Sequence, residues 1–218
     1  MKNQKQEFNR RSFIKKSSIF TVGAISTGSL FATSINAPFY ENSSDNINIV
    51  GPKEGFTPQI GTLVSMMNWM RNTMLMPVQG MSISDLDYLH DDNANTIGAM
   101  LMHLAATERF YQIHTLEGKK WGDWLKEDAK KWTTASGLGD NARKKIKGNN
   151  LNFYLDLLSE VREHTLSEFA KRDDDWLMAV DKDWAWGPTN NYCKWFHVCE
   201  HESNHNGQFK FIKKRIHS

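Results

Sequence analysis

The chain has 218 residues, of which 39% are hydrophobic and 24% are charged, and its mean hydropathy is −0.58. Its formal net charge of +2 is unevenly distributed: residues 1–37 hold six Lys and Arg against one Glu, which leaves 21 basic and 24 acidic residues. The rest of the chain has no excess of basic residues, and this argues against nucleic-acid binding.

The first 37 residues predict an export signal. Arg10 and Arg11 precede a modestly apolar stretch, residues 19–32, which is too short to span a bilayer comfortably. A charged region followed by a short apolar region is the layout of a secretory signal, and the paired arginines resemble a twin-arginine signal. We therefore expect export to the periplasm or cell envelope, with membrane contact only if the signal stays uncleaved. The alternative is a disordered basic N-terminus.

Residues 38–54 are polar and rich in turn-forming residues, and they predict a linker ahead of one domain, 55–218. Apolar residues then recur at helical spacing, and no segment alternates like a strand. The expected helices cover 57–76, 95–118 with Asn95 as N-cap, 150–171, and the segment after Pro188. Four such helices predict an all-α fold, a four-helix bundle.

The long connections between these helices are rich in tryptophan. Three of the tryptophans, in 119–148, suggest short helical turns that pack on the bundle, and Trp184 or Trp186 could line the mouth of a pocket. The two cysteines, Cys193 and Cys199, fall on different faces of the last helix, so we expect two free thiols.

Three histidines of the last helix, His197, His201 and His205, are spaced four residues apart and so share one face. His201 and His205 lie within its apolar stripe, where unpaired polar groups are costly to bury. A shared metal ion would satisfy them, and His103, which flanks the apolar stripe of the second helix, is the candidate third ligand. The alternative is a set of core histidines that bond to backbone or carboxylates. His197, at the edge of the stripe, is expected to lie outside the metal shell.

Two acidic residues lie near the histidines in the predicted helices. Glu108, five residues after His103, is a candidate general base, or else a carboxylate that pairs with an arginine or an indole. Glu202 falls close to the histidine face and could orient a ligand. Whether His197 or Glu202 joins the metal shell stays open.

Two segments, TIGAMLMHLAATERFY (96–111) and HVCEHESNHNGQF (197–209), resemble the DinB/YfiT-like superfamily of metal-dependent proteins. The resemblance extends to MNWMRN (67–72) and GMSISDLDYL (80–89). It implies a four-helix bundle in which His103, His201 and His205 hold a divalent metal ion. Zinc or nickel is the first expectation, and iron, copper or manganese are alternatives.

These observations predict an exported DinB-like metal-binding protein. A three-histidine site with an open position suits a metal-dependent hydrolase or a thiol transferase that acts on a small molecule. The alternative is a non-catalytic metal-binding or stress-associated protein of the cell envelope. A homodimer is an option that the sequence leaves open.

Overall fold

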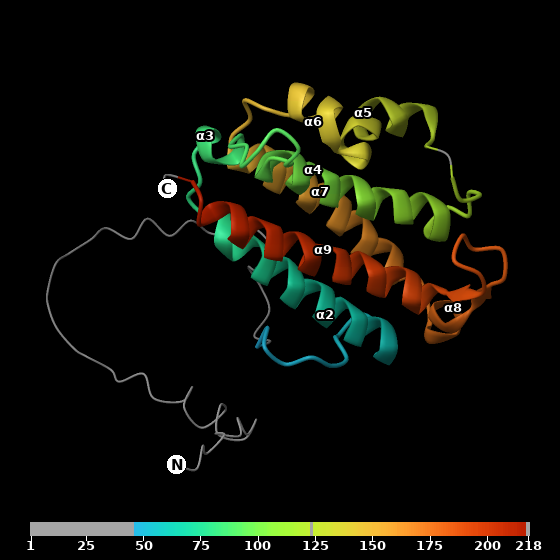
Figure 1. The fold of residues 1–218 in the computed structure, drawn as a ribbon. Coiled ribbons are helices and arrows are strands. Elements are labelled where there is room, and N and C mark those ends of the chain that lie inside the picture. Colours follow the sequence, from blue (N-terminus) through green and yellow to red (C-terminus); the bar gives the residue numbers. More distant parts are fainter. Residues whose placement is uncertain (1–45, 123, 217–218) are drawn as a thin grey trace, which may run out of the picture. The chain divides into compact units, whose positions relative to one another are not determined.

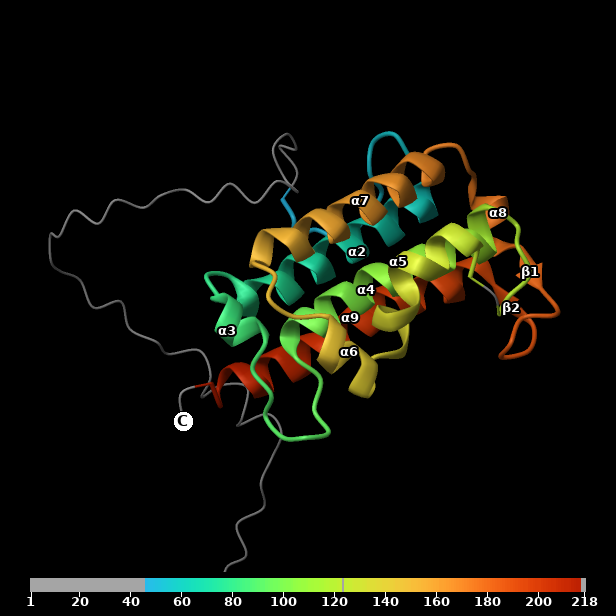
Figure 2. The ribbon, with the colours of Figure 1, turned by 90° about the horizontal axis from the view of Figure 1, so that it is seen from above.

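The computed structural model describes residues 46–122 and 124–216. The predicted signal segment, 1–37, lies outside the described residues, as do residues 38–45 of the predicted linker. Within the described part, four long helices run side by side (Figures 1 and 2). They are α2 (Pro58–Leu75), α4 (Ile97–Tyr111), α7 (Leu151–Phe169) and α9 (Asn191–Lys213). The expected all-α bundle is confirmed.

Local sequence signals explain where these helices begin. Pro58 occupies the first turn of α2, where the missing N–H costs nothing, and the side chains of Asn150 and Asn190 cap α7 and α9. The expectation that Asn95 caps α4 is wrong by one residue. Thr96 accepts the Ala99 N–H instead, because the Asn95 side chain accepts the N–H of Gly139 at 2.9 Å.

Helix α9 packs against α2 on one side and α4 on the other, and α4 packs against α7. One end of the bundle encloses a mainly aromatic and aliphatic cluster with contributions from all four long helices. Its largest fully buried side chains include Trp195, Phe169, Ile60, Leu63 and Met67. This packing fixes the rotation of α9 about its own axis, and therefore determines which of its faces lies against α4.

The connections contain more regular structure than the expected short turns. Helices α5 (Lys126–Gly137) and α6 (Gly139–Lys145) follow one another, and α5 packs along α4 (Figure 1). The remaining short elements are η1 (Met76–Val78), α3 (Ile83–Leu86), the π-helical turn η2 (Gln112–Leu116), α8 (Asp174–Met178), β1 (Val180–Asp181) and β2 (Thr189–Asn190). The strands form an antiparallel pair of two residues each, too short to show alternation in the sequence.

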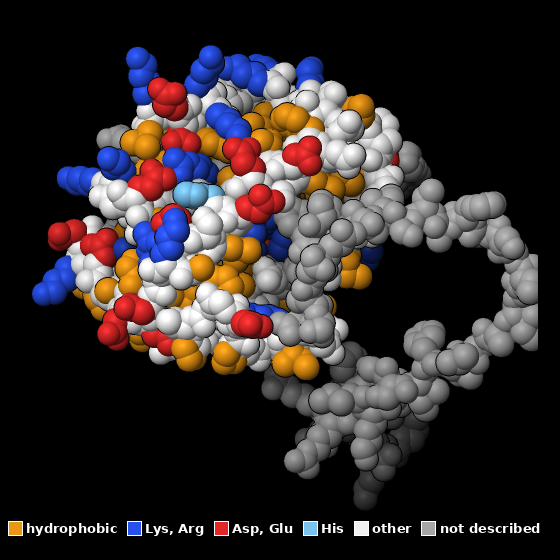
Figure 3. Space-filling view, turned by 180° about the vertical axis from the view of Figure 1, so that it is seen from behind, with side chains coloured by type: hydrophobic (Ala, Val, Ile, Leu, Met, Phe, Trp, Pro, Cys, Tyr) orange, Lys and Arg blue, Asp and Glu red, His pale blue; other side chains and the backbone are white. Residues whose placement is uncertain are grey.

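Among the described residues, no helix combines the length and the apolar character that crossing a bilayer requires. Lys and Arg side chains are interspersed with Asp and Glu on the face shown in Figure 3. Cys193 is exposed and Cys199 is buried, and both are free thiols, as expected.

Candidate metal centre

Three histidines from two helices converge between α4 and α9. Nε2 of His201 lies 2.9 Å from Nε2 of His103 and 3.2 Å from Nε2 of His205. The three side chains form a group whose ligand atoms all lie within 4.8 Å of one another. The four-residue spacing on α9 brings His201 and His205 together, and the packing of α9 against α4 adds His103. The structure thus brings together the three residues that the sequence singled out.

The hydrogen bonds made by Nδ1 determine the tautomer of each ring, and therefore whether its Nε2 carries a lone pair that can bind a metal ion. Nδ1 of His103 lies 3.0 Å from the carbonyl oxygen of Ala135, and Nδ1 of His205 lies 2.8 Å from Oε1 of Gln208. Both oxygens can only accept, so each Nδ1 carries the hydrogen and each Nε2 of these neutral rings carries a lone pair. Both lone pairs point to Nε2 of His201, which has at most one hydrogen to share. Hydrogen bonds among the three rings therefore cannot satisfy all three Nε2 atoms, whereas a bound cation would interact favourably with a lone pair from each ring.

Burial keeps all three rings neutral. It lowers the pKa of His103, because the charged form loses its hydration. Burial, followed by repulsion from the neighbouring histidines, lowers the pKa of His201 to about 3. The pKa of His205 falls to about 4, again mainly through burial and secondarily through His103. Neutral imidazole is the form that binds metals, so at neutral pH no proton has to leave before an ion binds.

The two distances from Nε2 of His201 to the other Nε2 atoms are compatible with a tetrahedral ion. Two nitrogens bound at ~2.05 Å with a tetrahedral angle between them lie about 3.3 Å apart, close to the 2.9 and 3.2 Å observed. Three nitrogen ligands leave one position open for a substrate, as in catalytic rather than structural sites. His103 and His201 are half-buried, so the group is reachable from solvent. The residues present therefore fit a divalent transition metal.

His197 lies outside the three-histidine group, as expected. Its Nδ1 is 2.9 Å from the hydroxyl of Tyr111, and its ring stacks on the Tyr111 ring at a centroid distance of 5.6 Å. Its ring centroid lies 5.5 Å from that of His201. His197 is thus a neighbour of the metal centre that is held by an aromatic partner.

Glu108 is buried in a network of ion pairs. Its oxygens accept hydrogen bonds from Arg71, Arg162 and Thr165, at distances of 2.7 to 3.1 Å. The two guanidinium groups lower its pKa even though burial alone would raise it. The proposed role of Glu108 as a general base stays a prediction. The contacts favour the alternative, in which the carboxylate pairs with arginine, because both of its oxygens are already in use.

Glu202 completes this network instead of orienting a histidine. Its Oε1 accepts from Nε of Arg71 at 2.8 Å and from Nη2 of Arg162 at 3.0 Å. One residue along a helix is a rotation of about 100°, so Glu202 faces the bundle interior while His201 faces the metal centre. Glu202 was expected to fall close to the histidine face and to orient a ligand, but its Oε1 contacts Arg71 and Arg162 instead. Each long helix contributes one member, Arg71, Glu108, Arg162 or Glu202, and the four charges cancel.

Two residues that hydrogen-bond to the ligand histidines were not identified from the sequence. Gln208 lies three residues after His205 on the same helix face, a spacing that could have identified it. The carbonyl of Ala135 could not have been found, because it comes from α5 in a connection expected to hold only short turns. It belongs to the last turn of α5, where it also accepts the N–H of Leu138 at 3.3 Å.

Comparison with known proteins agrees with this architecture. The model of the family described as mycothiol-S-transferase, a DinB/YfiT-like family, matches residues 62–218. A crystal structure of a conserved protein from Enterococcus faecalis superposes with a TM-score of 0.51 and 12% identity, over 70% of this chain and 93% of that one. Identity that low supports the fold alone. The comparison with curated proteins gave no significant match.

Proposed function

Because the chain belongs to the mycothiol-S-transferase family, we propose that it is a metal-dependent S-transferase. It would join the sulfur of a low-molecular-weight thiol to an electrophilic carbon of a second small molecule. The observation that carries this proposal is the convergence of three Nε2 atoms, of which two present lone pairs to the third.

The metal ligands proposed are His103, His201 and His205, and zinc or nickel is the first choice of metal. A divalent ion held there would supply positive charge that favours the thiolate form of a substrate thiol at neutral pH. The three neutral rings bring no charge of their own, so the full charge of the ion would act on the substrate. Ala135 and Gln208 hold two of the rings in the tautomer that this arrangement needs.

The reactive thiol is proposed to come from the substrate, and the buried cysteine of α9, Cys199, is unsuited to replace it. Burial, followed by repulsion from Glu202, raises the pKa of Cys199 to about 11, which keeps its thiol protonated and unreactive. In a displacement reaction the S–H bond of the substrate breaks and an S–C bond forms. The proton passes to solvent, and the leaving group departs with the electron pair of its bond to carbon.

The three-ligand group favours catalysis over a purely structural metal site. Structural sites usually close the coordination sphere with four protein ligands, whereas the group found among the described residues has three. Glu202 and His197, the two candidates for a fourth ligand, are bonded to arginines and to Tyr111 respectively. We therefore prefer the enzyme over the non-catalytic envelope protein.

We also keep export as part of the proposal, through the twin-arginine-type segment at residues 1–37. Such a signal would allow the protein to fold and take up its metal before transport. The segment lies outside the described residues, so its support is the sequence alone.

Thiol transfer can be tested directly. Protein loaded with zinc, nickel, iron, copper or manganese would be incubated with 1-chloro-2,4-dinitrobenzene and one thiol, either mycothiol, glutathione or N-acetylcysteine, and the thioether quantified by mass spectrometry. We expect a rate above background with at least one thiol, and loss of that rate in the His201→Ala/His205→Ala variant. Rates equal to background with every metal and thiol would contradict the proposal.

A further inference from the structure

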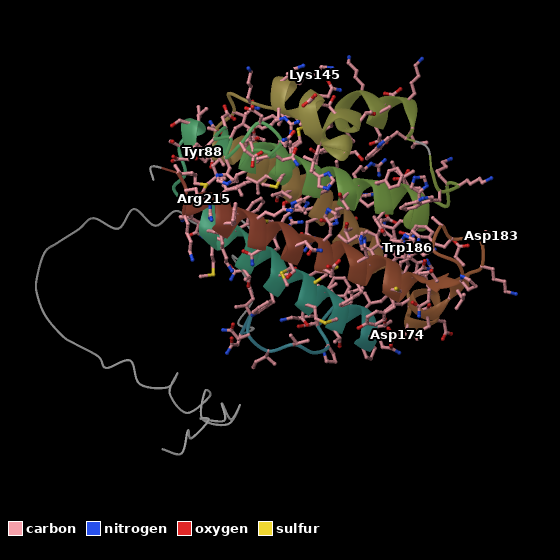
Figure 4. The ribbon with its side chains drawn as sticks, in the orientation of Figure 1. Tyr88, Lys145, Asp174, Asp183, Trp186 and Arg215 are labelled. Atoms are coloured by element: carbon pink, nitrogen blue, oxygen red, sulfur yellow. The ribbon has the colours of Figure 1, made fainter. Side chains whose placement is uncertain are left out.

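An exposed tryptophan contacts His197, the residue one helical turn before the metal ligand His201. Trp186 belongs to the loop 182–188, between β1 and β2, and 52% of its surface is exposed. Figure 4 places it at the end of the bundle near α8, next to α9. Its ring meets the His197 ring edge to face, with a centroid distance of 5.0 Å.

The loop that carries Trp186 is anchored to the core. Trp184 is buried, packs against Trp121 at a centroid distance of 4.2 Å, and has Nζ of Lys194 3.9 Å from its own ring centroid. Gly187, with φ of +91°, lets the chain turn so that its N–H bonds to the Trp184 carbonyl at 2.8 Å. The loop backbone on both sides of Trp186 is therefore anchored through Trp184 and Gly187.

The rings form a continuous series that leads to a metal ligand. Trp186 contacts His197, and His197 lies one helical turn before His201, with ring centroids 5.5 Å apart. Tyr111 backs His197 by stacking and by the hydrogen bond from hydroxyl to Nδ1. The ring of His197 thus lies between the exposed Trp186 and the metal ligand His201.

We propose that Trp186, with His197 and Tyr111 behind it, forms a subsite that binds an aromatic ring of the electrophilic acceptor. This inference rests on the proposed S-transferase function and names the class of its second substrate.

The chemistry of the subsite favours a flat apolar group over a charged one. The hydroxyl of Tyr111 and Nδ1 of His197 are bonded to each other, so the subsite offers mainly ring surfaces, with Nε2 of His197 and the indole N–H of Trp186 at their edges. Lys194, the cation that contacts the supporting Trp184 ring, is engaged by Asp181 at 3.0 Å. Aromatic rings pair favourably with other rings in offset or edge-to-face arrangements, whereas a charged group would lose hydration there without gaining a partner.

The test is an equilibrium binding measurement that needs no turnover. S-benzyl-N-acetylcysteine and S-ethyl-N-acetylcysteine, in which a phenyl ring and a methyl group respectively are attached to the same S–CH2 group, would be titrated calorimetrically into the zinc-loaded protein. We expect the benzyl compound to bind about tenfold more tightly. The preference should disappear in Trp186→Ala and persist in Trp186→Phe, which keeps a ring. Trp69→Ala is the matched control, since Trp69 is also an exposed tryptophan but lies on α2, outside the subsite.

Each other outcome overturns the inference. Equal affinity of wild-type protein for the two compounds, no binding of either, or a benzyl preference that survives Trp186→Ala would each exclude an aromatic subsite at Trp186. The result is separable from the transferase assay. A benzyl preference lost in Trp186→Ala, in a protein that forms no thioether, would leave the subsite standing and refute the proposed reaction.

Discussion

Gln208 accepts a hydrogen bond from Nδ1 of His205 at 2.8 Å, three residues further along α9. This bond places the lone pair of His205 on Nε2, which faces Nε2 of His201 at 3.2 Å. An exposed glutamine thus sets the tautomer and the ring orientation of a buried histidine. Partners of this kind tune metal affinity without touching the metal.

We expect Gln208→Ala to weaken metal binding by about 10- to 100-fold, the usual effect of removing a partner that orients a ligand. Competition with a chromogenic chelator would measure the affinity. Gln208→Glu, which keeps an acceptor at this position, should bind metal at least as tightly as the wild type.

The control for Gln208 is Asn204→Ala, an exposed residue of the same helix whose side chain bonds to Glu200. Its metal affinity should be unchanged. Equal losses in the two variants, or no loss in Gln208→Ala, would show that the His205–Gln208 bond has no bearing on the metal centre.

The buried ion network predicts a structural role for Glu108. Glu108→Gln leaves the guanidinium groups of Arg71 and Arg162 with one negative partner, Glu202, in a buried setting. Breaking a buried pair costs about 3–5 kcal/mol, so the midpoint of urea unfolding should fall sharply. Metal content and thioether formation, measured where the variant is still folded, should stay near wild type.

An exposed ion pair supplies the comparison for Glu108. Lys131 and Glu160 lie 2.8 Å apart on the surface, and Glu160→Gln should change the unfolding free energy by no more than about 1 kcal/mol. If Glu108→Gln abolished turnover with stability unchanged, the catalytic role first considered for Glu108 would regain support and the structural one would fall.

The parts of the site that the sequence revealed are those governed by local spacing. The four-residue interval of His201 and His205 follows from helix geometry, and the apolar stripes of α4 and α9 brought His103 into consideration. Long-range contacts could not be predicted from the sequence. The carbonyl of Ala135 reaches His103 only because α5 folds back on α4, and Glu202 turned out to face arginines on α2 and α7. The sequence suggested an arginine partner for Glu108 but could not say which arginine.

Close packing of α4 on α7 depends on a glycine. A Cβ added at Gly98 would lie 2.6 Å from the hydroxyl oxygen of Tyr154, on a fully buried ring. We expect Gly98→Ala to destabilise the protein by about 1–3 kcal/mol, because the ring cannot move without disturbing the core. Thermal unfolding would measure the change.

Gly207 provides the opposite case, in the interior of α9, where an added Cβ meets nothing within 4 Å. Gly207→Ala should stabilise the protein by roughly 0.5–1 kcal/mol, because alanine loses less conformational freedom in a helix than glycine does. Destabilisation by both substitutions would mean that α9 is not a regular helix at this point.

The metal-free protein should lose stability in mild acid. The pKa values of His201 and His205, about 3 and about 4, lie below the ordinary value of 6.5. Below pH 6.5 the unfolded chain therefore binds protons that the folded chain does not, which favours unfolding. Stability should be level above pH ~7 and fall by about 2 kcal/mol at pH 5, allowing for the partial exposure of His201.

Urea unfolding of chelator-treated protein at pH 7.5 and pH 5 would measure this dependence. The His201→Ala/His205→Ala variant lacks two of the responsible groups, so its loss of stability over the same interval should be clearly smaller. An equal loss in the two proteins would assign the pH dependence to other residues.

The central claim is that His103, His201 and His205 hold one divalent metal ion. The most direct test is the metal content, by mass spectrometry, of protein purified without a metal-affinity column, compared with the His201→Ala/His205→Ala variant and with His197→Ala. We predict about one ion per chain in the wild type and in His197→Ala, and none in the double variant. No metal in the wild type after reconstitution, or an equal content in the double variant, would contradict the claim.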